Sequence, residues 1–497
     1  MSILTKLHEI RDFVGERETV GIDDNTLAKF ANSDGDLREA IELGYKEYLC
    51  LKAGHAELLK LPERELIAVV QEGYVNFYDA NAVNPYVAIA AKGPWLVTSH
   101  GSVLHDSGGY GMLGFGHSPK PVLDAMSQKH VMANVMTASF QQRSLIEKLR
   151  AEIGHARQGD KRHPFESFIC LNSGSESVTI AARLADLNAA KLTSPGARHE
   201  GKKIMLLSLK GSFHGRTDRP AQASASSLPA YQQLASFRDR KNLMTVEPNN
   251  VEDLERVFEK AEKESIFFEM MLVEPVMGEG NPGVAMKREF YDRARELTRQ
   301  MGTLLLMDSI QAGLRAQGCL SVTDYPGFES CDPPDLETYS KAVNAGQYPL
   351  SILAMTKSAA GLYARGLYGN TMTTNPRALA VACAVLDLVT PELRTNVKER
   401  GLEFVEKLRA LKDEFPGVVT DVTGTGLLFA LHLKEEGYKV VGAHGIERYM
   451  RMHGIGVIHG GKNALRFTPH FRITSAEVDF IIDQIRKALQ QGPIFTA

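Results

Sequence analysis

The chain has 497 residues, among which 57 lysines and arginines nearly balance 60 aspartates and glutamates, for a formal net charge of −3. Because no block of like charges is long enough to make a polyanion-binding tail, we expect no nucleic-acid partner. A hydrophobic fraction of 43% and a charged fraction of 24% are typical of a globular α/β protein, which we expect to be cytoplasmic.

Secretion, membrane insertion and disulfide bonding are not expected either. Residues 1–18 mix charges through the stretch that a signal peptide keeps apolar. A membrane span needs about 18 consecutive apolar residues, and no such run occurs. The five cysteines are far apart, odd in number and without a Cys-x-x-Cys pair, so we predict neither a disulfide framework nor a metal site.

Residues 1–78 contain few glycines and are predicted to be helical. Asp36 followed by Glu39 indicates a capping box at one helix start, and Pro62 indicates a second start. We interpret the segment as a helical extension that packs on the body of the chain or on a partner subunit; an independent regulatory module is the alternative. The first helix should bury one stripe of side chains, namely Leu37, Ile41, Tyr45 and Leu49.

From about residue 85, short apolar runs are each followed by small or polar residues and then by helical periodicity. Runs without polar alternation suit strands that are buried on both faces of a parallel sheet. The alternation of strands and helices predicts an α/β fold with a mainly parallel, helix-covered sheet, whose ligands lie at the carboxyl ends of the strands. The runs are 167–171, 202–208, 270–275 and 303–308.

After about residue 375 the pattern changes to long helices, two strand-like segments and a last helix that Thr474 and Glu477 open as a capping box. We interpret this part as a smaller α+β domain that includes residues from both ends of the chain. The expected organisation is an extension at 1–78, the first part of the small domain at 79–130, the large domain at 131–375 and the rest of the small domain at 376–497.

Residues with useful chemistry follow the predicted strands. Each of them alone has a simpler explanation, because a Gly-Ser turn usually caps a helix, a strand-end aspartate usually caps a loop and a lysine is usually a surface charge. Together they offer an anion seat, a stacking aromatic ring, an acid and a lysine that can form a Schiff base. They are Gly174 and Ser175 after the first run, Phe213 and Arg216 after the second, Glu279 after the third, Asp308 after the fourth, and Lys341 further along.

These groups are together what pyridoxal 5′-phosphate requires. In their order and spacing, the motifs resemble those of the class III pyridoxal-phosphate aminotransferases of fold type I, the ω-aminotransferases, over about residues 85–490. The resemblance implies that the large domain binds this cofactor. It also implies a ping-pong transfer of an amino group, from the terminal amine of an ω-amino acid or diamine to 2-oxoglutarate.

The resemblance assigns cofactor roles to individual residues. Lys341 matches the lysine that holds the cofactor as a Schiff base, and Asp308 matches the acid that keeps the pyridine nitrogen protonated. Thr371 matches a threonine that reaches the phosphate of the neighbouring subunit, which implies a homodimer with a shared active site. The other assignments are Gly174 and Ser175 to the phosphate, Phe213 and Ile310 to the two ring faces, and Gln311 to the phenolic oxygen.

Three further residues are assigned to the substrates. Arg466 matches the arginine that binds the α-carboxylate of glutamate or 2-oxoglutarate, and Arg216 matches one that binds the distal carboxylate. Glu279 matches the acid that pairs with Arg466 when the amine donor has no carboxylate there. Such a pair would let one pocket accept a dicarboxylate in one half-reaction and an ω-amine in the other.

The sequence departs from the family pattern at three places and leaves other reactions open. Ser309 stands where the family usually has a glutamate, which removes one negative charge near the ring, Ala312 stands where threonine is usual, and Met277 stands where glutamine is usual. The alternatives are another reaction of the same cofactor, as in aminomutases, decarboxylases or racemases, and a non-catalytic scaffold paralogue.

Overall fold

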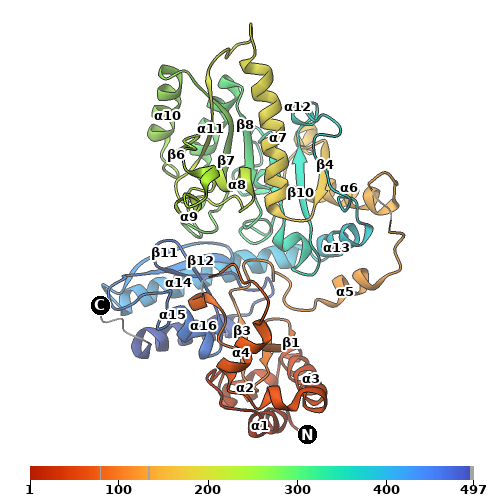
Figure 1. Cartoon of the computed structure of the whole chain (residues 1–497), viewed down its shortest axis with the longest axis vertical. Helices are drawn as coiled ribbons and strands as arrows, with labels where there is room; N and C mark the ends of the chain where they lie inside the picture. The colour runs from red at the N-terminus through yellow and green to blue at the C-terminus, as the bar shows by residue number, and fades with distance from the viewer. Residues whose placement is uncertain (79, 133–134, 493–497) are drawn as a thin grey trace. The chain divides into compact units, whose positions relative to one another are not determined.

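The computed structural model describes residues 1–78, 80–132 and 135–492 of a chain that divides into two compact units (Figure 1). The large unit comprises Pro121–Lys398 and Gly424–Gly426, and the small unit comprises Met1–Lys120, Glu399–Thr423 and Leu427–Ala497. Within the described ranges, every helix is too short or too polar to cross a lipid bilayer.

A seven-stranded sheet in the order β4-β10-β9-β8-β7-β5-β6 forms the centre of the large unit. All four apolar runs that were expected to be strands belong to it, as β4, β5, β7 and β8. Neighbours from β6 to β9 are parallel and only β10 runs antiparallel to its neighbours, so the mainly parallel sheet is confirmed. The strands are β4 Ser167–Leu171, β5 Lys203–Leu209, β6 Leu243–Val246, β7 Ile266–Val273, β8 Leu304–Asp308, β9 Leu336–Tyr339 and β10 Ser351–Met355.

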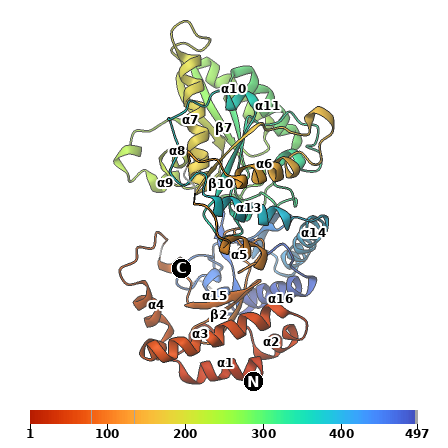
Figure 2. The ribbon, with the colours of Figure 1, turned by 90° about the vertical axis from the view of Figure 1, so that its right-hand side faces the viewer.

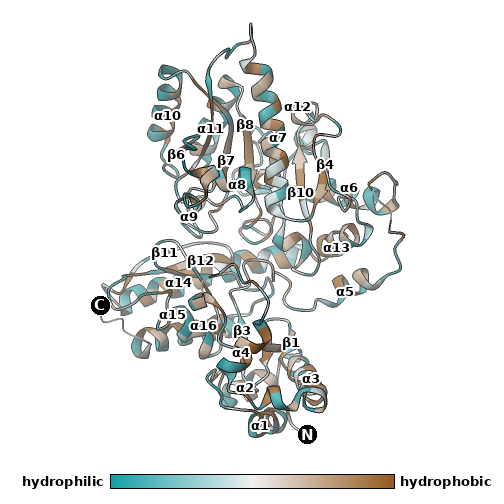
Figure 3. Cartoon of the chain, in the orientation of Figure 1, coloured by the Kyte–Doolittle hydropathy of each residue, from teal (hydrophilic) through white to brown (hydrophobic). Residues whose placement is uncertain are grey.

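Helices cover both faces of this sheet, with α7 on one face and α10 and α11 on the other (Figures 1 and 2). Val178 and Leu184 of α7 enter a core with Leu306 and Leu353, and Figure 3 shows hydrophobic colours along the strands, as burial of both faces requires. The helices are α5 Lys120–Ser127, α6 Phe140–Glu152, α7 Gly174–Thr193, α8 Asp218–Ala223, α9 Leu228–Tyr231, α10 Val251–Lys263, α11 Arg288–Met301, α12 Lys357–Ala360 and α13 Pro376–Asp387, with short 3-10 turns η2 Gly159–Lys161, η3 Ala235–Phe237, η4 Val322–Asp324 and η5 Lys341–Asn344.

The small unit contains two four-stranded sheets, in the orders β1-β2-β3-β13 and β11-β12-β15-β14. The strands are β1 Ala88–Lys92, β2 Trp95–Thr98, β3 Val103–Asp106, β11 Val419–Thr425, β12 Leu428–Leu433, β13 Ile455–Gly456, β14 Ile458–Gly460 and β15 Ala464–Phe467. The helices are α1 Ile3–Phe13, α2 Asp24–Ala31, α3 Gly35–Leu59, α4 Glu63–Gln71, α15 Ile446–Met452 and α16 Ser475–Gln491, with η1 Ala80–Ala82; α14 Pro391–Glu414 begins in the large unit and ends in the small one.

The N-terminal helices are part of the small unit. α3 packs on β1 and β2, and Gly44 lies so close to Val97 that a Cβ atom there would be 2.7 Å from its Cγ1. After residue 375, where the rest of the small domain was expected to begin, α13 packs on α6 and on η5. Residues 376–398 therefore belong to the large unit.

Two details of α3 differ from the prediction. Its N-cap is Asp34, whose carboxylate accepts the Leu37 amide at 3.1 Å, rather than Asp36. In the predicted stripe Leu49 is 43% exposed, whereas Tyr48 is fully buried. Around the helix axis, position 48 lies only about 20° from Leu37, whereas position 49 lies about 120° from it. Position 48 therefore stays on the buried face. The starts expected at Pro62 and Thr474 are confirmed as the caps of α4 and α16.

Candidate active site

Asp308 ends β8 at the carboxyl edge of the sheet and is only 3% exposed. Its Oδ2 lies 2.8 Å from Nδ1 of His214, which donates because a carboxylate only accepts, and its Oδ1 accepts the Ile310 amide at 3.2 Å. The His214 backbone amide is itself held by the Ser224 hydroxyl at 2.8 Å. The loop after β5 therefore orients the acid at the end of β8.

A second buried acid, Glu274, stands directly after β7. Its two carboxylate oxygens accept the backbone amides of Phe213 at 3.0 Å and Gly278 at 2.8 Å, so it ties the loop after β5 to the loop after β7. Burial and the neighbouring charge of Asp308 raise the pKa of Glu274 to about 7, against the opposing effects of His214 and the two amides. Sequence reasoning assigned no role to His214 or Glu274; the available signal was their position next to Phe213 and at the end of an apolar run.

Lys341 opens the 3-10 turn η5 after β9, and its Nζ donates a hydrogen bond to Oε1 of the buried Gln311. Its backbone φ of 45° lies in the left-handed region, which is strained for a residue with a Cβ atom and is most often retained at functional sites. β8 and β9 are parallel neighbours in which Asp308 pairs with Thr338. Lys341 and Asp308 thus leave the sheet from adjacent strand ends.

The predicted phosphate seat is the N-terminus of α7. Ser173 and Glu176 form a capping box at this end of the helix. The helix is 20 residues long, and the first turn of such a helix offers backbone amides and the positive end of the helix dipole to an anion. A Cβ atom at Gly174 would lie 2.5 Å from Cδ1 of Ile310. Ser175 accepts the Arg216 amide at 3.1 Å through its hydroxyl. The structure therefore brings Gly174, Ser175, Ile310 and Arg216 together.

Phe213, Arg216 and Glu279 lie on two loops that contact each other. The Arg216 guanidinium carbon is 5.1 Å from the centre of the Phe213 ring. A Cβ atom at Gly280 would clash with the carbonyl oxygen of Gly211, so the loop that carries Glu279 runs against the loop that carries Phe213. Thr371 is exposed, beside Met372, which is 46% exposed.

Arg466 belongs to the small unit. It lies in the middle of β15, paired with Ala430 of β12 and Ile458 of β14, and is 4% exposed. Burial and a hydrogen bond with Tyr78 raise the pKa of Tyr110, while the charges of Arg451 and Arg466 act in the opposite direction. Tyr78, Tyr110 and Arg451 also line a cavity of about 400 Å³ within this unit.

The chain is similar to known proteins over most of its length. The model of the family described as aminotransferase class-III matches residues 77–489. Acetylornithine aminotransferase of Mesorhizobium japonicum is 28% identical over 420 residues, which cover 82% of this chain and 94% of that protein. Ornithine aminotransferase 2 of Staphylococcus saprophyticus is 26% identical over 419 residues, with the same coverage of 82% and 94%. Among solved structures, ornithine aminotransferase of Toxoplasma gondii has a TM-score of 0.71 and 22% identity, over 88% of this chain and 98% of that one.

Proposed function

The chain belongs to the class III aminotransferases, pyridoxal-phosphate-dependent transaminases of fold type I, and on that premise we propose that it transfers the terminal amino group of an ω-amino acid or diamine to 2-oxoglutarate. The main observation behind the residue assignments is that Asp308 and Lys341 lie at the ends of two adjacent parallel strands, β8 and β9. The relatives named for ornithine and acetylornithine support a donor with a terminal amine, because both names denote such donors.

The residues of the large unit fit this cofactor. At Gly174 and Gly215 the backbone lies too close to Ile310 and Ser175, respectively, to leave room for a Cβ atom, so these segments pack closely beside a helix N-terminus that suits a phosphate. Asp308 suits a protonated ring nitrogen. When bound, pyridoxal phosphate supplies the carbonyl group that accepts the amino group and a ring that takes up the electrons left when a substrate C–H proton departs.

With the cofactor bound, the Asp308 carboxylate would keep the pyridine nitrogen protonated, and the Nδ1–H of His214 holds that carboxylate in a fixed orientation. Burial excludes water from this pair, which strengthens the attraction between the carboxylate and a cationic ring. The residues that would hold the rest of the cofactor are Phe213 and Ile310 at the ring, Gln311 at the phenolic oxygen, and Ser175 and Gly174 at the phosphate.

Lys341 would hold the cofactor through Nζ, and as a free amine it would carry the substrate proton on that same atom. The amide oxygen of Gln311 accepts a hydrogen of Nζ and so fixes the direction of the lysine side chain. For the substrates, the proposed roles are those that the resemblance implies: Arg466 for the α-carboxylate of 2-oxoglutarate, Arg216 for the distal carboxylate, and Glu279 as the acid that pairs with Arg466 in the donor half-reaction.

We also propose a homodimer in which Thr371 contributes to the partner's phosphate site. Two segments of the large unit expose large apolar side chains, and exposed apolar surface of this kind marks interfaces. Thr371 lies within the second segment. The exposed side chains are Val131 at 82%, Met132 at 55%, Val135 at 52%, Met136 at 86%, Phe140 at 86%, Leu367 at 51% and Met372 at 46%.

A panel of amine donors, assayed with and without 2-oxoglutarate, tests the proposal. We expect glutamate to form with at least one ω-amine donor, no turnover by Lys341→Ala, and a rise in KM for 2-oxoglutarate in Arg466→Ala that exceeds the change in KM for a diamine. Turnover that needs no 2-oxoglutarate would instead favour an aminomutase, decarboxylase or racemase. A protein that retains no cofactor absorbance would favour the scaffold paralogue.

A further inference from the structure

Glu337 is a buried acid on the strand that leads to Lys341. It is 0% exposed, lies in β9 and pairs in register with Met307 of the parallel strand β8. The next pair in the register joins Thr338 to Asp308. Glu337 is therefore one residue pair away from the acid that is proposed to hold the ring nitrogen.

The Glu337 carboxyl group is bound by hydroxyl and amide donors. Its Oε1 accepts the Ser309 hydroxyl at 2.6 Å and the Val322 amide at 2.9 Å, and its Oε2 accepts the Ser321 hydroxyl at 2.6 Å. None of the ion pairs found between described residues includes Glu337, so it is buried without a cation. Burial without a cation costs stability, and burial accordingly raises the pKa of Glu337 to about 7.

Ser309 links this acid to the cofactor residues. It stands between Asp308 and the pair Ile310 and Gln311, and its backbone makes two more bonds, from its amide to the Thr338 carbonyl at 3.0 Å and from the Gly313 amide to its carbonyl at 2.8 Å. Of these three hydrogen bonds of Ser309, only the one to Glu337 involves a side chain of β9. Ser309 also stands where the family pattern has a glutamate. In this chain, the carboxyl group that contacts position 309 comes from Glu337 on the neighbouring strand.

We propose that Glu337 is a positioning residue, which through the Ser309 hydroxyl fixes the segment Asp308–Gln311 against β9, the strand that leads to Lys341. Asp308 and Lys341 must engage opposite ends of one small ring, and misplacement of either by about 1 Å is enough to weaken binding and turnover strongly. The proposal rests on the roles proposed for Asp308 and Lys341.

The test compares two serines that donate to the same carboxyl group over the same 2.6 Å distance. Ser309→Ala removes the donor next to Asp308, and Ser321→Ala removes the donor from a segment that carries no proposed cofactor residue. Each holoenzyme is dialysed to equilibrium against a series of pyridoxal phosphate concentrations, the bound cofactor is quantified by absorbance, and kcat, KM and the melting temperature are measured in parallel. We expect Ser309→Ala to retain the cofactor about tenfold more weakly and to lower kcat more than it changes KM, whereas Ser321→Ala stays within about twofold in affinity.

Glu337→Leu and the double variant Ser309→Ala/Glu337→Leu complete a cycle. If Glu337 acts through Ser309, the serine substitution adds nothing to the loss of affinity once the acid is gone. Equal affinities for Ser309→Ala and Ser321→Ala, or additive effects in the cycle, would overturn the proposal. Lys341→Ala in the same dialysis separates a failure of this proposal from a failure of the proposed function. The proposed function is contradicted if the wild-type chain binds no cofactor, or if the Lys341→Ala chain binds it as well as the wild type does.

Discussion

At the scale of single residues, the contact between His214 and Asp308 gives the site its most specific electrostatic feature. The imidazole is fully buried and donates to the carboxylate over 2.8 Å. The sequence places His214 in a loop after a predicted strand, but its partner lies 94 positions further along the chain. Only the parallel pairing of β5, β7 and β8 brings the two together, so composition and spacing along the chain could not reveal the contact.

Replacing this imidazole should impair turnover. In His214→Phe the Asp308 carboxylate loses a charge-assisted hydrogen bond, and we expect kcat to fall about 10- to 100-fold with a smaller change in KM for the donor, measured by steady-state kinetics. His199→Phe is the control, because His199 is another buried imidazole of the large unit, stacked on Phe267. An equal fall in kcat in both variants would show that His214 acts only through folding.

In the small unit, Glu477 should make stability depend on acid pH. Its Oε1 lies 3.0 Å from Nε2 of His105 and 2.9 Å from Nε2 of His470. Burial alone would raise the pKa of Glu477, but the charges of these histidines and their hydrogen bonds bring it well below its usual range. A lowered pKa in the folded chain stabilises it above the pKa of the unfolded chain, 4.5, and this contribution is lost as pH falls below that value.

We therefore expect Glu477→Gln to be destabilised by about 2–3 kcal/mol at pH 7 and by much less near pH 3.5, as measured by urea unfolding at both pH values. The exposed Glu436 provides the matched control, since Glu436→Gln should match the wild type at both. A difference between Glu477→Gln and the wild type that grows toward acid pH would contradict the assignment.

At the scale of elements, local sequence predicted four strands of the large sheet because each is a short apolar run that ends in small or polar residues. The same local signals did not assign β10, which enters between β4 and β9 in the antiparallel direction. The position and direction of a strand in a sheet depend on the strands it pairs with, and its own residues carry no information about those partners. The proposed cofactor residues at the strand ends could be named from the sequence, whereas Glu274 and Glu337, the buried acids that hydrogen-bond to the segments carrying them, could not.

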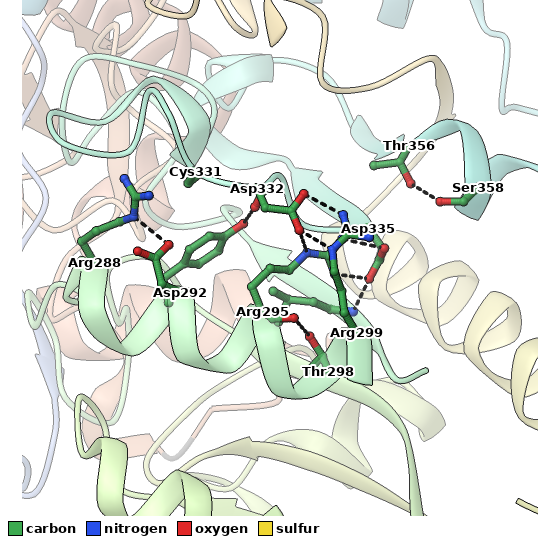
Figure 4. Close-up of polar contacts among 12 residues, drawn as sticks. Arg288, Asp292, Arg295, Thr298, Arg299, Cys331, Asp332, Asp335, Thr356 and Ser358 are labelled. Atoms are coloured by element: carbon green, nitrogen blue, oxygen red, sulfur yellow. Dashed lines mark hydrogen bonds and ion pairs between the residues drawn. The ribbon is translucent and has the colours of Figure 1, made fainter. Parts of the chain in front are cut away.

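A cluster of charges fixes β9 to α11 (Figure 4). Arg295, which is 3% exposed, binds both oxygens of Asp335 at 2.7 and 2.9 Å, and Asp335 also accepts the Leu305 amide at 2.9 Å. Asp335 immediately precedes β9, the strand that leads to Lys341. The cluster therefore holds the start of the strand that leads to the proposed catalytic lysine.

Arg295→Leu should destabilise the chain by about 3–5 kcal/mol in urea unfolding, because it leaves a buried carboxylate without its cation. The double variant Arg295→Leu/Asp335→Leu should recover part of that loss. Arg299→Leu is the control, since Arg299 binds Asp332 from a side chain that is 55% exposed and should cost at most about 1 kcal/mol. A double variant less stable than Arg295→Leu would argue against charge burial as the cause.

At the scale of the whole molecule, the sequence left open whether residues 1–78 dock on the body, on a partner or nowhere. An amphipathic stripe shows that a helix docks but not on which surface, and the packing of α3 on β1 and β2 became visible only in the structure. The dimer is a prediction of the same kind, because exposed apolar side chains indicate that a surface is covered without identifying what covers it.

Charged substitutions on that surface test the dimer. Met136→Asp/Phe140→Asp should shift the protein from twice the mass of one chain to a single chain in sedimentation equilibrium and should lower cofactor retention, because each site would lose the partner's Thr371. Leu402→Asp is the control, as Leu402 is 66% exposed on α14 and lies outside both apolar segments. A wild-type chain that sediments as a monomer would contradict the shared site.

The identity of the lysine that holds the cofactor is the most direct test of the whole account. Borohydride reduction of the cofactor-loaded enzyme fixes the cofactor covalently on that lysine, and mass spectrometry of the digested protein then locates it. We predict one modified peptide, with the pyridoxyl group on Lys341. Modification of any other lysine, or an unmodified Lys341 in a preparation that turns over, would contradict the assignment of this site.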